Sequence, residues 1–444
     1  MVRRLFYRAF RLLSGIQHRM RRRFTPAGLL ALGALVASAV VGLDTNQTLA
    51  YQAFAFLAAL FAISLAWSAR VRPRAEARRV LPRFGSAGAP VAYRVLVRNP
   101  TGRPQAGLTV LEDFADPRPS FEEFSHAPEP GQPGYDWLDR AAGYSRWVWL
   151  VARRRGAVVP EQTVPALGPR GEGEVRVELT PSRRGFVRFA GLTLARPDPF
   201  GLSRALTPVP LPQSLLVLPK RYPVPPVQLP GRRKFQQGGV ALAGSVGDSE
   251  EFVALRDYRP GDPLRRIHWK SWARVGKPIV KEYQDEFFVR HALVLDTFLL
   301  AESDLFEDAV SVAASFAYAM PTQESLLDLL FVGPEAYCFT AGRGVGPVDR
   351  MLEILACVGV CRDKPFRTLH QLVVSRCASL SGCVVVLVAW DEARRAFADH
   401  LAALGVPALV LLVTDPRRPG TADLPGAHVR RLQVGRIAEG LAAL

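Results

Sequence analysis

Two uncharged stretches near the N-terminus, Pro26–Leu43 (PAGLLALGALVASAVVGL) and Leu49–Ser68 (LAYQAFAFLAALFAISLAWS), decide where the rest of the chain is placed. An uncharged helix the length of the first stretch is about 27 Å long, close to the hydrocarbon thickness of a bilayer. The short polar segment between them has room only for a turn. Tyr51 and Trp67 lie near opposite ends of the second stretch, as aromatic anchors at a membrane interface do. The pattern predicts a transmembrane helical hairpin over residues 26–68.

Arginine clusters on both sides of this hairpin predict its orientation. Eight Arg precede the first stretch and six follow the second within a short distance. Because positive charge next to a span stays inside the cell, we expect a basic N-terminus (1–25) and a basic connector (69–87) on the cytoplasmic side. A cleaved signal peptide is the first alternative, but the first stretch is long and a second one follows. A buried hairpin of a soluble domain is the other alternative, and the flanking arginines argue against it.

Most of the net charge of +17 lies in the same two regions that flank the hairpin. The first 83 residues contain 14 Arg and only two acidic residues, Asp44 and Glu76, so they hold most of the excess. Anionic headgroups attract such flanking arginines, which makes the lipid bilayer the expected partner. We predict no nucleic-acid partner, because no basic stripe with interleaved aromatic residues remains outside the flanks.

A β domain is predicted over residues 88–219. Val91–Val97, Trp147–Val151 and Glu174–Leu179 alternate between apolar and other residues, and turn signals separate them. The spacing is typical of an all-β immunoglobulin-like sandwich, with Phe114–Asp136 as a Pro-rich insertion. A Pro/Gly-rich linker over residues 220–247 follows it.

The C-terminal region, residues 291–444, alternates strand and helix patterns. Continuous apolar strands are expected at His291–Leu295, Cys383–Ala389 and Ala408–Val413, and Asp304–Met320 has helical spacing. Such runs are typical of a mostly parallel sheet covered on both faces, so we predict an open α/β domain. The predicted fold class is therefore multidomain: two transmembrane helices, a β-sandwich and an α/β domain.

Between the linker and the α/β domain, residues 248–290 contain a distinctive segment, EEFVALRDYRPGDPLRRIHWKSWAR at 250–274. It resembles the signature of domain-of-unknown-function family fifty-eight, and Arg184–Phe186 and Asp198–Leu202 resemble that family's upstream pattern. The matching signature positions are Phe252, Leu255, Arg256, Tyr258, Pro260, Gly261, Asp262, Arg265, Ile267, His268, Trp269, Ala273 and Arg274. The resemblance covers roughly Arg183 to the C-terminus.

The resemblance carries implications for the fold and the partners. Members of the family are bacterial membrane proteins that are often encoded beside an AAA+ ATPase of the MoxR class. The resemblance implies that residues 291–444 form a von Willebrand factor A-like, Rossmann-type domain and that the chain works with such an ATPase. Other membrane-complex proteins remain possible partners, and the implied location is the bacterial cytoplasmic (inner) membrane.

The signature admits a structural and an interaction interpretation. In the first, Pro260, Gly261 and Asp262 form a tight turn whose carboxylate caps a following helix, while Arg–carboxylate pairs hold the segment in place. In the second, Trp269 and the arginines form an exposed surface for a partner. Catalysis by His268 is the least favoured interpretation. The interaction or structural residues are Arg256, Tyr258, Pro260, Gly261, Asp262, Arg265, His268, Trp269 and Arg274.

A metal site is not expected. The metal site of von Willebrand A domains begins with Asp-x-Ser-x-Ser, and here Phe298 and Leu300 follow Asp296 in place of the two serines. Hard cations need oxygen ligands, which leaves Asp296 as a weak candidate only. The five cysteines lie in the last quarter, and we expect reduced thiols. Cys357 and Cys361 share a predicted helix face among apolar neighbours, which favours core cysteines over zinc ligands.

These patterns favour a membrane-anchored, non-enzymatic adaptor or assembly factor that works with a cytoplasmic MoxR-type AAA+ ATPase. We predict no catalytic residue and no cofactor, since no phosphate-binding loop, nucleophile elbow or zinc-protease motif occurs. One alternative is an envelope-related hydrolase that uses His268, Asp262 or Asp296. Another is a divalent-metal-dependent ligand-binding domain.

Overall fold

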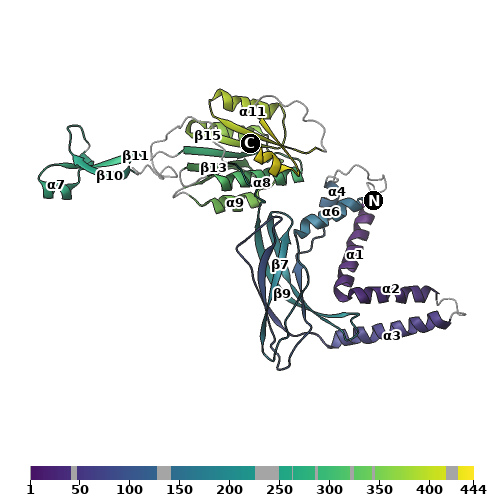
Figure 1. Cartoon of the computed structure of the whole chain (residues 1–444). Helices are drawn as coiled ribbons and strands as arrows, with labels where there is room; N and C mark the ends of the chain where they lie inside the picture. The colour runs from purple at the N-terminus through teal and green to yellow at the C-terminus, as the bar shows by residue number, and fades with distance from the viewer. Residues whose placement is uncertain are drawn as a thin grey trace. The chain divides into compact units, whose positions relative to one another are not determined.

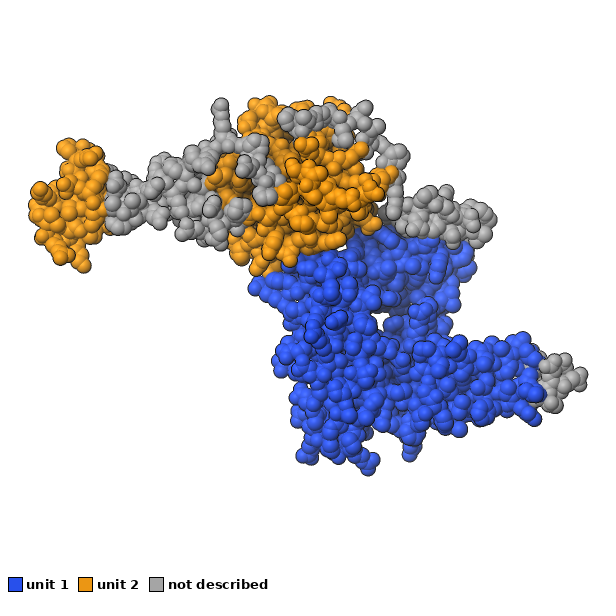
Figure 2. All heavy atoms as spheres, viewed as in Figure 1, with its two compact units in different colours: residues 1–218 blue, residues 219–444 orange. Residues whose placement is uncertain are grey.

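The computed structural model describes residues 2–41, 48–127, 142–225, 250–262, 264–285, 289–320, 325–342, 346–416 and 429–444. It divides into two compact units, Met1–Leu218 and Pro219–Leu444 (Figure 2). The predicted turn of the helical hairpin at 44–47 and most of the predicted linker at 220–247 lie outside the described residues. The result is a mixed α/β, multidomain protein with several sheets.

Unit 1 begins with three helices, α1 (Val2–Arg23), α2 (Pro26–Val41) and α3 (Thr48–Arg70). Helix α3 is apolar and long enough to cross a membrane over Leu49–Arg70, whereas the apolar α2 has 16 described residues. The two lie side by side as a hairpin (Figure 1). Among the described residues, one helix is thus compatible with membrane anchoring.

The chain turns sharply between α1 and α2 for a local reason. Pro26 begins α2, where its missing N–H costs no helical hydrogen bond. The hydroxyl of Thr25 accepts a bond from the backbone N–H of Gly28 at 3.0 Å, which caps the new helix. Because a helix cannot continue through this pair, α1 runs across the direction of the α2–α3 hairpin (Figure 1).

The β domain consists of two sheets around one core. Residues of alternating strands supply that core: Tyr93, Val95 and Val97 from one sheet lie with Leu192 and Leu194 from the other. The first sheet has the order β1 (Glu76–Val80), β3 (Val91–Arg98), β7 (Glu172–Pro181), β5 (Ala157–Val158). The second has the order β2 (Phe84–Ser86), β9 (Arg204–Leu218), β8 (Gly185–Pro197), β4 (Thr109–Phe114), β6 (Gln162–Thr163).

Two expectations for this domain were wrong. The domain begins earlier than residue 88, because β1 and β2 lie within the stretch expected to be a connector. The predicted strand at Trp147–Val151 belongs to helix α6 (Tyr144–Arg155). Trp147 and Leu150, three residues apart, are its buried apolar side chains, and they pack with Phe124 of α4 (Phe121–His126) and with Tyr7 of α1. That spacing is helical, and the alternation of aromatic and aliphatic residues concealed it.

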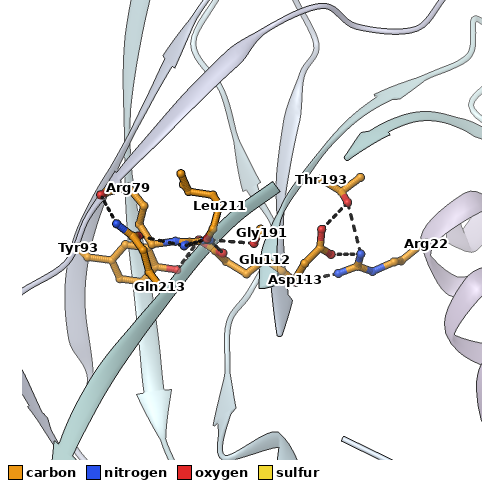
Figure 3. Close-up of polar contacts among 9 residues, drawn as sticks. All are labelled: Arg22, Arg79, Tyr93, Glu112, Asp113, Gly191, Thr193, Leu211 and Gln213. Carbon is orange, nitrogen blue, oxygen red and sulfur yellow. Dashed lines mark hydrogen bonds and ion pairs between the residues drawn. The ribbon is translucent and has the colours of Figure 1, made fainter. Parts of the chain in front are cut away.

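A buried ion pair joins the two sheets. Arg79 of β1 donates from Nε to Glu112 of β4 at 3.1 Å, and the hydroxyl of Tyr93 donates to the same carboxylate at 2.7 Å (Figure 3). Burial and the Glu112 carboxylate raise the pKa of Tyr93. On the other side of β4, the neighbouring Asp113 pairs with Arg22 of α1 (Figure 3). Arg79 and Arg22 are two of the arginines that flank the predicted hairpin, and both form ion pairs within unit 1.

The α/β domain of unit 2 has one six-stranded sheet in the order β14-β13-β12-β15-β16-β17. Its strands are β12 (Val289–Leu295), β13 (Ser325–Val332), β14 (Ala336–Ala341), β15 (Gly382–Leu387), β16 (Ala408–Thr414) and β17 (Val429–Gln433). All neighbours pair in parallel except β13 and β14. Counted along the chain, this is the order 3-2-1-4-5-6 of doubly wound sheets, whose direction changes between β12 and β15.

Helices cover both faces of this sheet, as the continuous apolar strands predicted. Helix α11 lies on one face, and α8 and α9 lie on the other (Figure 1). The helices are α8 (Asp304–Ala319), α9 (Val348–Cys357), α10 (Arg367–Val374), α11 (Glu392–Ala403) and α12 (Ile437–Ala442). Burial of β15 along its whole length follows from this double cover.

Candidate functional site

The family signature forms an antiparallel hairpin with a short helix inside it. Strand β10 (Glu250–Asp257) pairs with β11 (Ile279–Asp285), and between them lie a 3-10 turn (Leu264–Arg266) and α7 (Trp269–Val275). Ile267 and Val280 bridge the inserted segment to β11 and are buried, at 6% and 1% exposure. These apolar contacts hold the inserted segment against the hairpin.

The carboxylate of Asp262 closes the turn that precedes α7. Gly261 has φ of 105°, a conformation that favours glycine, and Asp262 accepts the backbone N–H of Arg259 at 2.8 Å. The guanidinium of Arg256 donates to both oxygens of Asp262, at 2.7 and 2.8 Å. These bonds from Arg256 and Arg259 lower the pKa of Asp262 to about 2. Asp262 therefore ties the turn back to β10 and does not cap the following helix.

The imidazole of His268 serves the same local structure. Its Nδ1 lies 2.6 Å from the hydroxyl of Ser271 in the first turn of α7. The backbone N–H of His268 donates to Ile279 at 2.8 Å, and that of Tyr258 donates to Pro278 at 2.9 Å. Pro260, Arg265 and Arg274 are exposed around this frame.

The signature carries exposed aromatic, aliphatic and basic side chains. The rings of Trp269 and Trp272 stack with centroids 5.2 Å apart, and Trp269 is 63% exposed. Leu264 and Val275 add exposed apolar area, at 67% and 57%. Residues 256–281 contain eight Lys or Arg and two Asp. We call the set Leu264, Trp269, Trp272, Lys270, Arg274 and Val275 the signature surface. Its composition suits an acidic partner with an apolar centre.

A second candidate lies where the α/β sheet changes direction, at the carboxyl end of β12. Asp296 is fully buried there, and Arg394 of α11 donates to both of its oxygens, at 2.6 and 3.1 Å. The backbone N–H groups of Phe298 and Val388 donate to the same carboxylate at 3.0 and 3.3 Å. Burial opposes the charge of Arg394, but Asp296 and Asp391 outweigh it and raise its pKa.

The guanidinium thus supplies a cation at Asp296, the weak metal candidate in the sequence. A divalent cation at Asp296 would have to displace a buried, two-pronged ion pair. Among the residues that the structure describes, no three His, Cys, Asp or Glu side chains gather as a metal-binding group. Arg394 was missed in the sequence because an arginine in the first turn of a helix usually faces solvent.

None of the five cysteines forms a disulfide in this structure. Cys361, Cys377 and Cys383 are buried, and burial raises the pKa of Cys383 to about 12. The expectation that Cys357 and Cys361 share a helix face was wrong, because α9 ends at Cys357.

The upstream pattern Asp198–Leu202 connects β8 to β9 and contacts both apolar helices. Ser64 of α3 donates a hydrogen bond to Asp198, and Ser68 lies 2.7 Å, oxygen to oxygen, from Ser203 beside it. Burial disfavours the charge of Asp198, but bonds from Ser64 and from backbone N–H groups outweigh it and lower its pKa. A Cβ on Gly28 of α2 would lie 1.9 Å from the carbonyl oxygen of Leu202. This loop therefore joins the helical hairpin closely to the β domain.

These features define a class: a multidomain protein with an apolar helix, a two-sheet β domain and a doubly wound domain whose switch point holds an ion pair. Residues 254–418 match the family described as "Protein of unknown function DUF58", in agreement with the resemblance of the signature. A 125-residue stretch is 30% identical to "Uncharacterized protein YeaD" of Bacillus subtilis (strain 168). It covers 28% of this chain and 31% of that protein, so less than a third of the relative is matched.

Solved structures resemble the chain only weakly. A PapD-like domain of human CEP192 matches with 10% identity and a TM-score of 0.19, over 33% of this chain and 87% of that one. A GH20 exo-β-N-acetylglucosaminidase from Vibrio harveyi matches with 9% identity and a TM-score of 0.12, over 77% and 57%. Such scores carry no argument about fold or function.

Proposed function

We propose that this protein is a membrane-anchored, non-enzymatic adaptor or assembly factor that works with a cytoplasmic MoxR-type AAA+ ATPase. The observation that carries the proposal is the signature surface, where the exposed Trp269 stacks on the half-buried Trp272 in a segment rich in basic side chains. Tryptophan and arginine dominate the energetics of protein interfaces, so an exposed tryptophan in a basic segment favours a binding role.

The internal bonds of the signature support a binding role. Asp262 is hydrogen-bonded to Arg256, and His268 to Ser271, so these polar groups stabilise the hairpin. A frame held in this way presents Trp269 in one conformation, which lowers the entropic cost of binding.

The anchor in this proposal is the α2–α3 hairpin, with both soluble ends in the cytoplasm of a bacterial cell. The uncharged sequence continues beyond the described end of α2 to Leu43, which is long enough for a second span. Arginines before and after the hairpin favour the cytoplasmic placement of both ends at the inner membrane.

We further propose an immunoglobulin-like class for the β domain and a von Willebrand A-like class for the α/β domain. Two sheets with mainly antiparallel pairing around one core support the first. The doubly wound strand order, with Asp296 at the switch point, supports the second.

The two alternatives have less structural support. A hydrolase would need a free carboxylate, but those of Asp262 and Asp296 are each held by an arginine. A metal-dependent ligand-binding domain would need Asp296 as a ligand. Calorimetry of the full chain with Mg²⁺, Mn²⁺ and Ca²⁺ would revive the second alternative if heat of binding were measured.

The adaptor proposal is tested by capture of a MoxR-type ATPase on the detergent-solubilised full chain, with ATP, with ADP and without nucleotide. We expect Trp269→Ala to weaken capture at least tenfold, about 1.4 kcal/mol, because hot-spot tryptophans contribute this much or more. Leu300→Ala, at a residue that is 93% exposed outside the signature, is the matched control and should bind normally. No capture in any nucleotide state, or equal capture by Trp269→Ala, would contradict the proposal.

A further inference from the structure

Helix α1 has a packed face and an unpacked one. Tyr7 is 7% exposed and donates its hydroxyl proton to the carbonyl of Pro119 at 3.1 Å. Its ring and that of Phe10 pack against Trp147 of α6, with centroids 5.7 and 6.0 Å apart. The last turn is tied to the β domain through the ion pair of Arg22 with Asp113. The packed face therefore fixes how the rest of α1 is oriented in unit 1.

The unpacked face of α1 is apolar. Leu5, Ala9, Leu12 and Ile16 recur at intervals of four, three and four residues, which places them in one stripe along the helix. Leu5, Leu12 and Ile16 are 69%, 66% and 53% exposed. On a helical wheel this stripe lies opposite Tyr7. Exposed leucines in such a row mark a surface that is covered in the working protein.

The same helix also carries many basic side chains. Helix α1 contains eight Arg and no acidic residue, and Arg8 and Arg19 lie exposed at one edge of the stripe. A basic helix with a row of exposed leucines has the composition of helices that lie in the plane of a membrane surface. Its arginines would contact anionic headgroups while the leucines enter the acyl boundary.

The direction of α1 fits that placement. Because the chain turns sharply at Thr25 and Pro26, α1 runs across the α2–α3 hairpin (Figure 1). If the hairpin crosses the bilayer, a helix that runs across it lies along the membrane surface. The stripe ends at Ile16, and four arginines lie between it and the start of the apolar helix α2 at Pro26.

We propose that α1 is an interfacial helix whose stripe, Leu5, Ala9, Leu12 and Ile16, binds the anionic cytoplasmic face of the bilayer. The inference rests on the membrane anchoring in the proposed function and adds a lipid-binding site to it. A second copy of the chain is a poorer occupant, because pairing two stripes would bring their arginine edges together. The site would hold the β domain at a fixed angle to the membrane.

The test measures where spin labels on the full chain lie after reconstitution into vesicles of phosphatidylglycerol and phosphatidylcholine. Labels are attached to Leu12→Cys or Ile16→Cys, with His18→Cys as the control, since this exposed residue lies nearly opposite Ile16 on the helix. Phe56→Cys, at a residue of α3 that is 68% exposed, reports the anchor. All variants carry Cys357→Ser, because Cys357 is the exposed native thiol.

We expect the labels at Leu12 and Ile16 to be several-fold more accessible to oxygen, which concentrates in lipid, than to a water-soluble nickel chelate. The label at His18 should show the reverse, and vesicles of phosphatidylcholine alone should weaken the difference at Leu12. If Leu12 is open to nickel while Phe56 is in lipid, the inference fails and the anchor stands. If Leu12 is shielded from both reagents, a protein contact covers the stripe and the inference fails. If Phe56 is also open to nickel, the anchor itself fails.

Discussion

The ion pair between Arg394 and Asp296 gives the sharpest prediction about the α/β domain. Arg394→Met removes two hydrogen bonds to Asp296 and leaves a carboxylate that is fully buried. Breaking a buried pair in this way costs about 3–5 kcal/mol. Because Phe298 and Val388 still donate to the carboxylate, we expect the lower end, about 3 kcal/mol.

Hydrogen exchange of the full chain, followed by mass spectrometry, measures this loss in β12 and α11 separately from the β domain. A loss of about 3 kcal/mol corresponds to exchange that is roughly a hundredfold faster. Arg395→Met is the matched control, because Arg395 is the exposed neighbour on the same helix, and it should change stability by less than about 0.5 kcal/mol. Adding Asp296→Asn to Arg394→Met should restore part of the protection, since the unpaired charge is gone.

Two outcomes would contradict a stabilising role of this ion pair. If Arg394→Met and Arg395→Met change protection equally, the pair does not stabilise the switch point. If Mg²⁺ instead stabilises the Arg394→Met variant, the Asp296 carboxylate can bind a metal ion in the position that the Arg394 guanidinium occupies in the unmodified chain.

Three further predictions concern unit 1 and the signature. Arg79→Met should destabilise the β domain by about 3–5 kcal/mol, because it leaves Glu112 buried without its cation; unchanged exchange in the two sheets would contradict this. Gly28→Ala should lower the thermal midpoint of the solubilised chain, since its Cβ would lie 1.9 Å from a carbonyl oxygen, and overpacking costs about 1–3 kcal/mol. Gly33→Ala, with nothing within 4 Å, is its control and should be neutral. The carboxyl of Asp262 should titrate in an NMR experiment with a pKa of about 2, so the signature turn keeps this bond above about pH 4 and loses it as pH falls toward 2.

Much of the architecture could be predicted from local sequence patterns. The three apolar strands at 291–295, 383–389 and 408–413 and the helix at 304–320 were predicted close to their observed bounds. Burial on both faces of a parallel sheet leaves such continuous runs of Val and Leu. The signature was recognised from its residues, and the family match over residues 254–418 agrees with it. Helix α6 was predicted wrongly, because a short aromatic and aliphatic run fits both periods.

Such local patterns do not predict ion pairs between residues that lie far apart in the chain. Arg79 and Glu112 are 33 residues apart, and Arg394 and Asp296 are 98 residues apart. An arginine in the sequence looks like a surface charge, and only the packing of two sheets, or of a helix on a strand end, removes it from water.

The uncharged helices, the basic flanks, the alternation of strands and helices, and the signature can all be recognised in the sequence, because each depends on neighbours within a few residues. The tertiary structure alone decided which arginines are buried, that Asp262 closes its own turn, and which face of α1 remains uncovered. Those outcomes depend on which distant segments meet, and hydrophobic periodicity does not encode the pairing of one charged residue with another.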